Sequence, residues 1–156
     1  PEPLIQKEFS RIMSLKDGSK KMSKSELSDL SRINLTDDRD AIVNKIKKAK
    51  TDPLPMPSSV EELNERLEAR NLLGIYSSLN NSTLQNTVKN FSGKNFSEFK
   101  NQLSDLLVKK IEPISLEIKK LLNDQPYLDK ILLEGVEKAN LIASKKIDRI
   151  KEILGF

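Results

Sequence analysis

Eight apolar residues recur at helical spacing along the end of the chain. They lie 4, 4, 3, 4, 4, 3 and 4 positions apart: Leu128, Leu132, Val136, Ala139, Ala143, Ile147, Ile150 and Leu154. This spacing places all of them on one face of a continuous α-helix. Pro126 suits the first turn of that helix, and Gly155 suits its end. We therefore predict a long C-terminal helix whose apolar stripe lies in a core.

The segment before this helix shows the same helical period three more times. The predicted helices cover residues 72–79, 82–91 and 97–121. Ser82 and Ser97 are suited to begin the second and third of them, and Gly93 separates the two. Pro113 should kink the third helix, because it removes a backbone donor. Residues 70–156 are therefore predicted to form a helical bundle.

The first third of the chain is less regular. Residues 9–15 are short and partly alternating, which is typical of a strand that runs into a loop. Residues 16–35 are polar and lack a helical period. Residues 37–50 predict a helix that Thr36 or Asp37 can cap, with acids in its first turn and lysines in its last turns. Ile42, Ile46 and Ala49 form its apolar stripe.

Three alternating prolines follow this predicted helix. Pro53, Pro55 and Pro57 exclude a helix and predict an extended linker. Ser59 and Glu62 can then form a capping box that begins a further short helix.

The composition limits the chemistry that the chain can perform. The sequence has no cysteine and no histidine, which excludes disulfides, thiolate metal sites and imidazole bases. We identify no metal site. The net charge is +4, and the first 50 residues carry that whole excess with 12 basic and 8 acidic side chains. A basic stretch suits a polyanion such as a phosphate or RNA, although a solvated face explains so small an excess equally well.

The pentapeptide Lys21-Met22-Ser23-Lys24-Ser25 is the motif with the clearest chemistry. Two lysines on a mobile loop can place charges on a polyphosphate, and serine hydroxyls and backbone N–H groups can complete the cradle. A lysine that approaches only as pyrophosphate leaves would stabilise the transition state selectively. Taken alone, a loop rich in lysine and serine is more often simply solvated.

The neighbouring residues favour the functional reading of this loop. The motif is a signature of class I aminoacyl-tRNA synthetases, and residues 11–20 before it resemble the tryptophanyl branch of that family. Residues 45–52, 71–77 and 134–140 resemble further blocks of that branch, in the same order. The resemblance covers essentially the whole chain.

The resemblance implies a mainly α fold with two parts. Residues 1–52 would be the last strand, loop and helix of a Rossmann-like catalytic domain. Residues 53–69 would be a proline-rich linker, and residues 70–156 a helical tRNA-binding domain that helps to read the anticodon.

The resemblance also implies roles for individual residues. Lys21 and Lys24 would be the catalytic lysines that bind ATP phosphates and stabilise the leaving pyrophosphate. The implied ATP-binding set is Ile12, Lys21, Met22, Ser23, Lys24 and Ser25. Glu26 stands where the family usually has Asp, and Leu27 stands where it often has Pro. Glu and Asp carry the same charge, so we expect no loss of function.

The implied activity is ATP-dependent activation of tryptophan and its transfer to tRNA in the cytoplasm. The implied partners are the tRNA for tryptophan, L-tryptophan and ATP, with Mg²⁺ held by the ATP phosphates, and the whole protein would be a homodimer without membrane association. The family's second nucleotide signature contains histidines, and this chain has none. The chain is therefore expected to be a C-terminal part that lacks the tryptophan pocket and is inactive alone.

Several alternatives remain open at this point. Lys45 and Lys48 can contact tRNA phosphates, or they can be surface lysines that complement the helix dipole. Tyr76 can stack on an unpaired base, but its apolar neighbours favour the core. For the whole chain, the alternatives are an autonomous helical RNA-binding module and a helical interaction protein.

Overall fold

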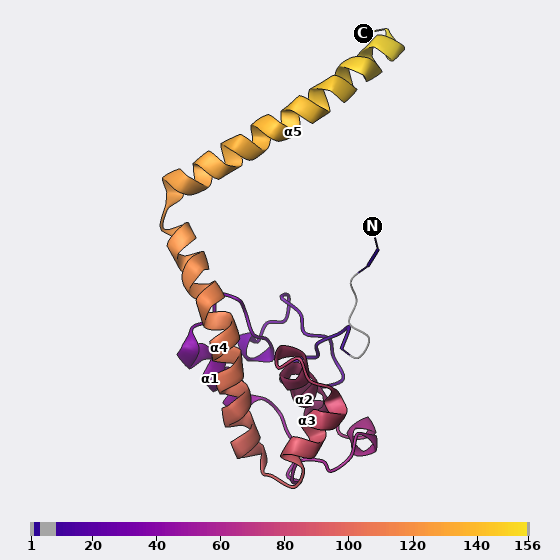
Figure 1. Ribbon diagram of the computed structural model, residues 1–156, viewed down its shortest axis with the longest axis vertical. Helices are drawn as coiled ribbons and strands as arrows, with labels where there is room; N and C mark the ends of the chain where they lie inside the picture. Colours follow the sequence, from indigo (N-terminus) through magenta and orange to yellow (C-terminus); the bar gives the residue numbers. More distant parts are fainter. Residues whose placement is uncertain (1, 4–8, 156) are drawn as a thin grey trace. The chain divides into compact units, whose positions relative to one another are not determined.

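Helices dominate the computed structural model, which describes residues 2–3 and 9–155 (Figure 1). The α-helices are α1 (Arg39–Lys48), α2 (Leu67–Leu79), α3 (Leu84–Phe91), α4 (Phe96–Leu122) and α5 (Gln125–Leu154). Two short 3-10 helices, η1 (Asp29–Ser31) and η2 (Glu61–Asn64), accompany them. The chain divides into two compact units, Pro1–Ser115 and Leu116–Phe156. The mainly helical fold expected from the sequence is confirmed.

The first unit is built around one apolar core. Many of its most deeply buried side chains come from the loop before α1 and from α1, α2 and α4, among them Leu15, Ile42, Ile46, Leu72, Leu73, Phe99 and Leu103. The predicted inner face of α1 is confirmed, because Ile42, Ile46 and Ala49 are all buried. Most of the stability of these short helices comes from this packing, since isolated helices of such length are marginal in water.

Three aromatic rings join α2, α3 and α4. The ring centroids of Tyr76 and Phe91 are 5.0 Å apart at an edge-on angle, and those of Phe91 and Phe99 are 4.8 Å apart. Edge-to-face pairs of this kind add to the area that they bury. Tyr76 is partly buried and therefore packs against the core, as its apolar neighbours in the sequence predicted.

The helices begin at caps one or two residues away from the predicted ones. The side chains of Asp38, Thr83 and Asn95 each accept a hydrogen bond from the backbone N–H three residues further on. Asp37 and Ser82 were predicted as caps, but other partners engage them. Asp37 accepts from Lys45, and the Ser82 hydroxyl pairs with that of Thr87. Sequence patterns leave such neighbouring candidates indistinguishable.

The strand predicted for residues 9–15 is wrong. Among the described residues only an isolated antiparallel bridge forms there, between Met13 and Lys21. The other edge of Met13 faces the side-chain amide of Asn71 on α2, which accepts from the Met13 N–H at 2.9 Å and donates to its carbonyl at 2.8 Å. A side chain thus satisfies the backbone groups that a second strand would otherwise pair.

The proline-rich segment, which the sequence predicted as an extended linker, packs against the rest of the first unit. Met56 and Pro57 are buried, and the Met56 backbone bonds to the α3–α4 turn at Lys94 and Gly93, at 2.8 and 3.2 Å. The Glu62 carboxylate accepts from the Ser58 N–H, so the expected capping box with Ser59 does not form. Only the 3-10 helix η2 follows, in place of the α-helix that the sequence predicted.

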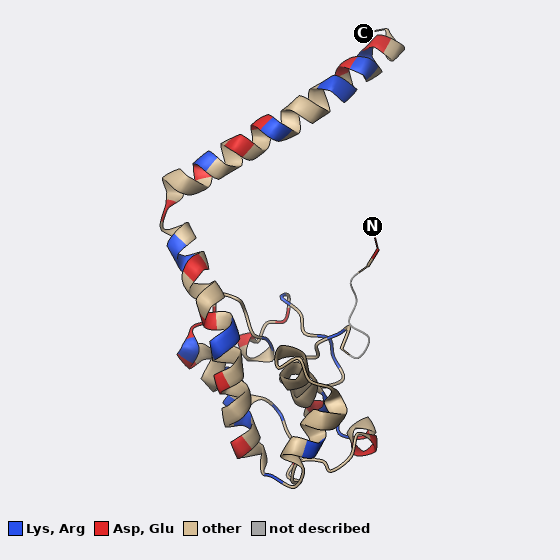
Figure 2. Cartoon of the chain, viewed as in Figure 1, with Lys and Arg blue, Asp and Glu red and all other residues tan. Residues whose placement is uncertain are grey.

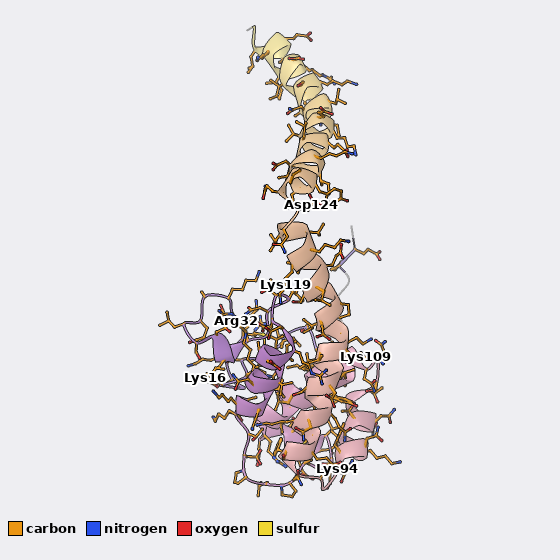
Figure 3. The ribbon with its side chains drawn as sticks, turned by 90° about the vertical axis from the view of Figure 1, so that its left-hand side faces the viewer. Lys16, Arg32, Lys94, Lys109, Lys119 and Asp124 are labelled. Atoms are coloured by element: carbon orange, nitrogen blue, oxygen red, sulfur yellow. The ribbon has the colours of Figure 1, made fainter. Side chains whose placement is uncertain are left out.

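Helix α5 begins and ends as predicted, but its apolar stripe is not buried in a core. Asp124 (labelled in Figure 3) caps its start, Pro126 lies in its first turn, and Gly155 ends it in the left-handed conformation with φ 79°. No residue of α5 is buried, and acidic and basic residues alternate along it (Figure 2). A helix can bury a stripe only against another packed element, and its own unit contains only the end of α4 besides α5.

No helix in the described part of the chain is both long enough and apolar enough to cross a membrane.

Gly18 allows the loop after Met13 to approach α2 closely, and this contact can be tested. A Cβ there would lie 2.7 Å from the Leu67 carbonyl carbon and 2.8 Å from the Glu68 nitrogen. Because helix backbone cannot yield cheaply, we expect Gly18→Ala to lower the free energy of unfolding by about 2 kcal/mol. Gly135 on α5 is the control, since a Cβ there meets nothing within 4 Å.

Gly135→Ala should raise helix stability by about 1 kcal/mol through helix propensity alone. Both variants are measured by urea denaturation followed by circular dichroism. A Gly18→Ala protein as stable as the unsubstituted chain would contradict the close approach.

Candidate functional site

The Lys21–Ser25 loop extends from a tight hairpin. The Ser14 N–H donates to the Lys20 carbonyl at 2.8 Å, and the Met22 N–H donates to the Ile12 carbonyl at 3.0 Å. Met22 and Ile12 also pack against the core of the first unit. The start of the loop is therefore fixed, while Ser23 and Ser25 bond mainly to each other, with 2.8 Å between their hydroxyl oxygens.

Both predicted catalytic lysines face solvent. Lys21 and Lys24 are exposed, and neither forms an ion pair with any acidic side chain in the described part of the chain. Their ammonium groups are thus available to an external anion. Ser23 and Ser25 are exposed as well, so the tip of the loop presents hydroxyls beside the charges.

A pocket of about 630 Å³ lies against this loop. It is lined by Ser10, Arg11, Ile12, Lys21, Met22, Ser23, Lys24, Arg32, Ile33, Asn34, Leu35 and Thr36. Of the predicted ATP-binding residues, only Ser25 is not part of its wall. A larger cavity of about 710 Å³ lies beside η2, α2 and α3, but no predicted site residue lines it. The chemistry of the smaller pocket is therefore the more informative.

The pocket combines positive charge with an apolar surface. Arg11, Lys21, Lys24 and Arg32 supply four cations, and no acidic residue is among the described residues that line it. Such a wall suits a polyphosphate, because lysine and arginine both donate hydrogen bonds to phosphate oxygens. Ile12, Met22, Ile33 and Leu35 supply apolar area on which a flat ring can lie.

Sequence analysis missed two of these four cations. Arg11 directly precedes Ile12 of the implied ATP-binding set, so its place in the sequence indicated that it could reach the same ligand. Arg32 lies in a polar segment without a helical or strand period, and no sequence signal distinguishes it. Only the fold brings it to the pocket.

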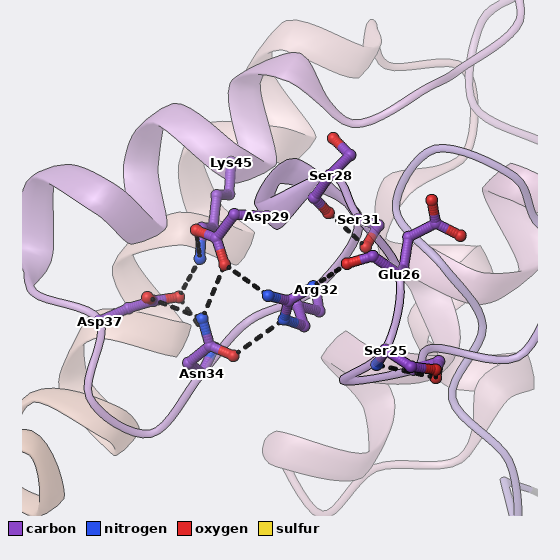
Figure 4. A network of polar contacts seen from close by, with 10 residues as sticks. Ser25, Glu26, Ser28, Asp29, Ser31, Arg32, Asn34, Asp37 and Lys45 are labelled. Atoms are coloured by element: carbon purple, nitrogen blue, oxygen red, sulfur yellow. Dashed lines mark hydrogen bonds and ion pairs between the residues drawn. The ribbon is translucent and has the colours of Figure 1, made fainter.

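Arg32 connects the end of the loop to a network of polar contacts around the buried Lys45 (Figure 4). Its Nη1 donates to the Glu26 carbonyl oxygen at 2.8 Å, and its Nε donates to Asn34 Oδ1 at 3.2 Å. Its Nη2 lies 3.2 Å from Asp29 Oδ1. One guanidinium therefore holds three partners from three positions of the chain, which its rigid fork of donors allows.

The centre of this network is Lys45 of α1. Its Nζ lies 2.6 Å from Asp29 Oδ2 and 2.7 Å from Asp37 Oδ2, and the side chain is only 3% exposed. Asn34 donates to both carboxylates. The hydrogen bond from Lys45, followed by that from Asn34, holds the pKa of the Asp29 carboxyl below its usual value.

This arrangement corrects the prediction that Lys45 contacts tRNA phosphates. A buried ammonium that two carboxylates already engage cannot reach an external phosphate. The sequence contained a signal for this, because Lys45 lies three residues after Ile42 and four residues before Ala49, on the same helical face as these apolar side chains. Lys48 is exposed, and its contact with tRNA phosphates stays a prediction.

Comparison with known proteins agrees with the chemistry of this pocket. The family model described as "tRNA synthetases class I (W and Y)" matches residues 1–112. The chain belongs to this family of class I tRNA synthetases.

Individual relatives within this family are similar to the chain over nearly its whole length. A protein of Agrobacterium fabrum named tryptophan–tRNA ligase is 52% identical over 155 residues, which are 99% of this chain and 44% of that protein. The tryptophan–tRNA ligase of Rickettsia conorii is 48% identical over 156 residues, which are 100% of this chain and 47% of that protein. The chain thus spans less than half the length of these relatives.

A solved structure supports the fold over nearly the whole chain. The crystal structure of tryptophanyl-tRNA synthetase from Mycoplasma pneumoniae superposes with a TM-score of 0.69. It covers 97% of this chain and 45% of that one, at 24% sequence identity.

The lowered pKa of Asp29 predicts how pH affects stability. A carboxyl whose pKa is lower in the folded protein stabilises the fold above its unfolded pKa of about 3.9, and this contribution disappears as pH falls through the folded value. We expect Asp29→Asn to be less stable than the unsubstituted protein at pH 7, with a difference that narrows toward pH 3.

The measurement is the urea midpoint at several pH values. Asp105→Asn on the exposed face of α4 is the control, and it should follow the unsubstituted protein throughout. A difference between Asp29→Asn and the unsubstituted protein that stays constant from pH 7 to pH 3 would contradict the charged interaction with Lys45.

Proposed function

We propose that this chain supplies the ATP-phosphate loop and the tRNA-facing helices of a tryptophan–tRNA ligase. Such an enzyme activates tryptophan with ATP and transfers it to the tRNA for tryptophan. The observation that carries the proposal is the pocket in which Lys21 and Lys24 stand beside the apolar surface of Ile12 and Met22. The names of the relatives support the choice of amino acid.

The pocket suits the first of these two steps. The carboxylate of tryptophan attacks the α-phosphorus of ATP, the bond to the bridging oxygen of the β-phosphate breaks, and pyrophosphate leaves with the electron pair. Negative charge therefore gathers on the leaving group, where Lys21 and Lys24 can stabilise it. An interaction that strengthens only as the bond breaks accelerates the step instead of merely tightening binding.

The donor set of the pocket fits the phosphates better than it fits a metal ion. The pocket wall is cationic, and no cluster of three or more carboxylates that could hold a metal occurs among the described residues. We propose that Mg²⁺ accompanies ATP on its phosphate oxygens. Lys21 and Lys24 would then bind the oxygens that the ion leaves free.

The remaining parts of the proposal concern the whole protein. Lys48, exposed near the end of α1, is proposed to contact tRNA phosphates. We propose that tryptophan binds outside this chain and that the whole protein works as a cytoplasmic homodimer.

The decisive assay is tryptophan-dependent exchange of pyrophosphate into ATP by the whole protein. Lys24→Ala should lower kcat for exchange by about 100-fold, because it removes a donor that acts on the developing charge. Lys109→Ala, which removes an exposed lysine of α4 far along the chain from the loop, should leave kcat within about twofold.

Two results would refute the proposal. A whole protein that exchanges pyrophosphate with another amino acid but not with tryptophan would exclude the named substrate. A Lys24→Ala protein as active as Lys109→Ala would exclude the role of the loop.

A further inference from the structure

Two anchors hold the functional loop, one on each side of its tip. On one side, the Met22 N–H donates to the Ile12 carbonyl at 3.0 Å. On the other side, Arg32 Nη1 donates to the Glu26 carbonyl at 2.8 Å. Only residues 23–25 lie between these anchors. The two lysines therefore differ in how their backbone is held. Lys21 lies within the hairpin, where its backbone pairs with that of Met13, and Lys24 lies on the short span between the anchors.

The second anchor is connected to the rigid part of the unit. Arg32 is 18% exposed, and its Nη2 pairs with Asp29, which the buried Lys45 of α1 holds in turn. Its Nε also bonds to Asn34 (Figure 4). Because Asn34 and Asp29 fix the planar guanidinium through Nε and Nη2, its Nη1 takes a defined position. The Glu26 carbonyl accepts its hydrogen bond from Nη1 there.

We propose that Arg32 is a positioning residue for Lys24. By holding the Glu26 carbonyl, its guanidinium sets how far the tip of the loop can travel and where the Lys24 ammonium meets the leaving pyrophosphate. This inference rests on the proposed function and extends it to a residue that lies outside the Lys21–Ser25 motif.

A competing role follows from the position of Arg32 in the pocket wall. If Arg32 bound the ATP phosphates directly in the ground state, its removal would raise KM for ATP and leave kcat nearly unchanged. If it acts through Lys24, its removal lowers kcat and kcat/KM together, because the lost interaction exists only in the transition state. The two roles are therefore separable by steady-state kinetics.

The experiment is a double-substitution cycle in the whole protein. Pyrophosphate exchange is measured for the unsubstituted protein, Arg32→Met, Lys24→Ala and the combination of both. We expect Arg32→Met alone to lower kcat by about 10- to 100-fold, with KM for ATP and for tryptophan within twofold. In the Lys24→Ala background the same substitution should change kcat by less than twofold, since there is no ammonium left to position.

Two further variants separate positioning from folding and from charge. Arg39→Met, on the exposed first turn of α1, is the matched control and should keep kcat within twofold. Arg32→Lys keeps the charge and can pair with Asp29, but a single ammonium cannot also hold Glu26 and Asn34 in the same geometry. It should stay folded in a thermal unfolding scan and still lose at least 10-fold in kcat.

The outcomes distinguish the inference from the function on which it rests. Absence of tryptophan-dependent exchange by the unsubstituted protein would overturn the proposed function, and the inference with it. With exchange present, any of three results overturns only the inference: full activity of Arg32→Lys, an increase in KM for ATP without loss of kcat, or independent effects of Arg32→Met and Lys24→Ala.

Discussion

The ion pairs of the buried Lys45 ammonium with Asp29 and Asp37 are the interactions on which the structure around the Lys21–Ser25 loop depends. Residues 26–37 contain only the three-residue η1, so helix and strand hydrogen bonds cannot hold them in place. Lys45 instead draws Asp29 and Asp37 onto α1, and Asn34 completes the contacts. Removing a lysine from water is costly, and two carboxylates at hydrogen-bond distance offset that cost. The same carboxylate of Asp29 then orients Arg32 beside the loop.

A second set of contacts fixes the other side of the site. The amide of Asn71 pairs with the backbone of Met13, and Gly18 lets the following turn approach the first turn of α2. Lys50 and Glu68 add an ion pair of 2.8 Å across the same junction. The hydrogen bond and charge of Glu68 raise the pKa of Lys50 above its usual value. Contacts to α1 and to α2 thus hold the segment of residues 13–37, whose loop tip at residues 23–25 stays exposed.

Much of the helical part was predictable from the sequence because local patterns determine it. The apolar face of α1 and the ends of α5 follow from spacing and from Pro and Gly, and both were predicted correctly. The loop of Lys21 and Lys24 was recognisable as a motif, and the pocket contains most of the predicted ATP-binding residues. The strand at residues 9–15 was predicted wrongly, because a strand requires a partner that a local pattern cannot supply. The stripe of α5 was assigned to a core for the same reason: amphipathicity shows that a face can be buried, not what covers it.

The sequence by itself determined where the helices lie, how they end, and which loop has the residues to handle phosphate. These are properties of neighbouring residues, and backbone sterics, helical periodicity and side-chain chemistry are enough to establish them. The tertiary structure decided which charges are available at the surface. It buried Lys45 between two aspartates, brought Arg32 to the end of the loop, and left Lys21 and Lys24 exposed. All four are cationic side chains in a polar sequence, and only contacts between segments distant in the chain make them different.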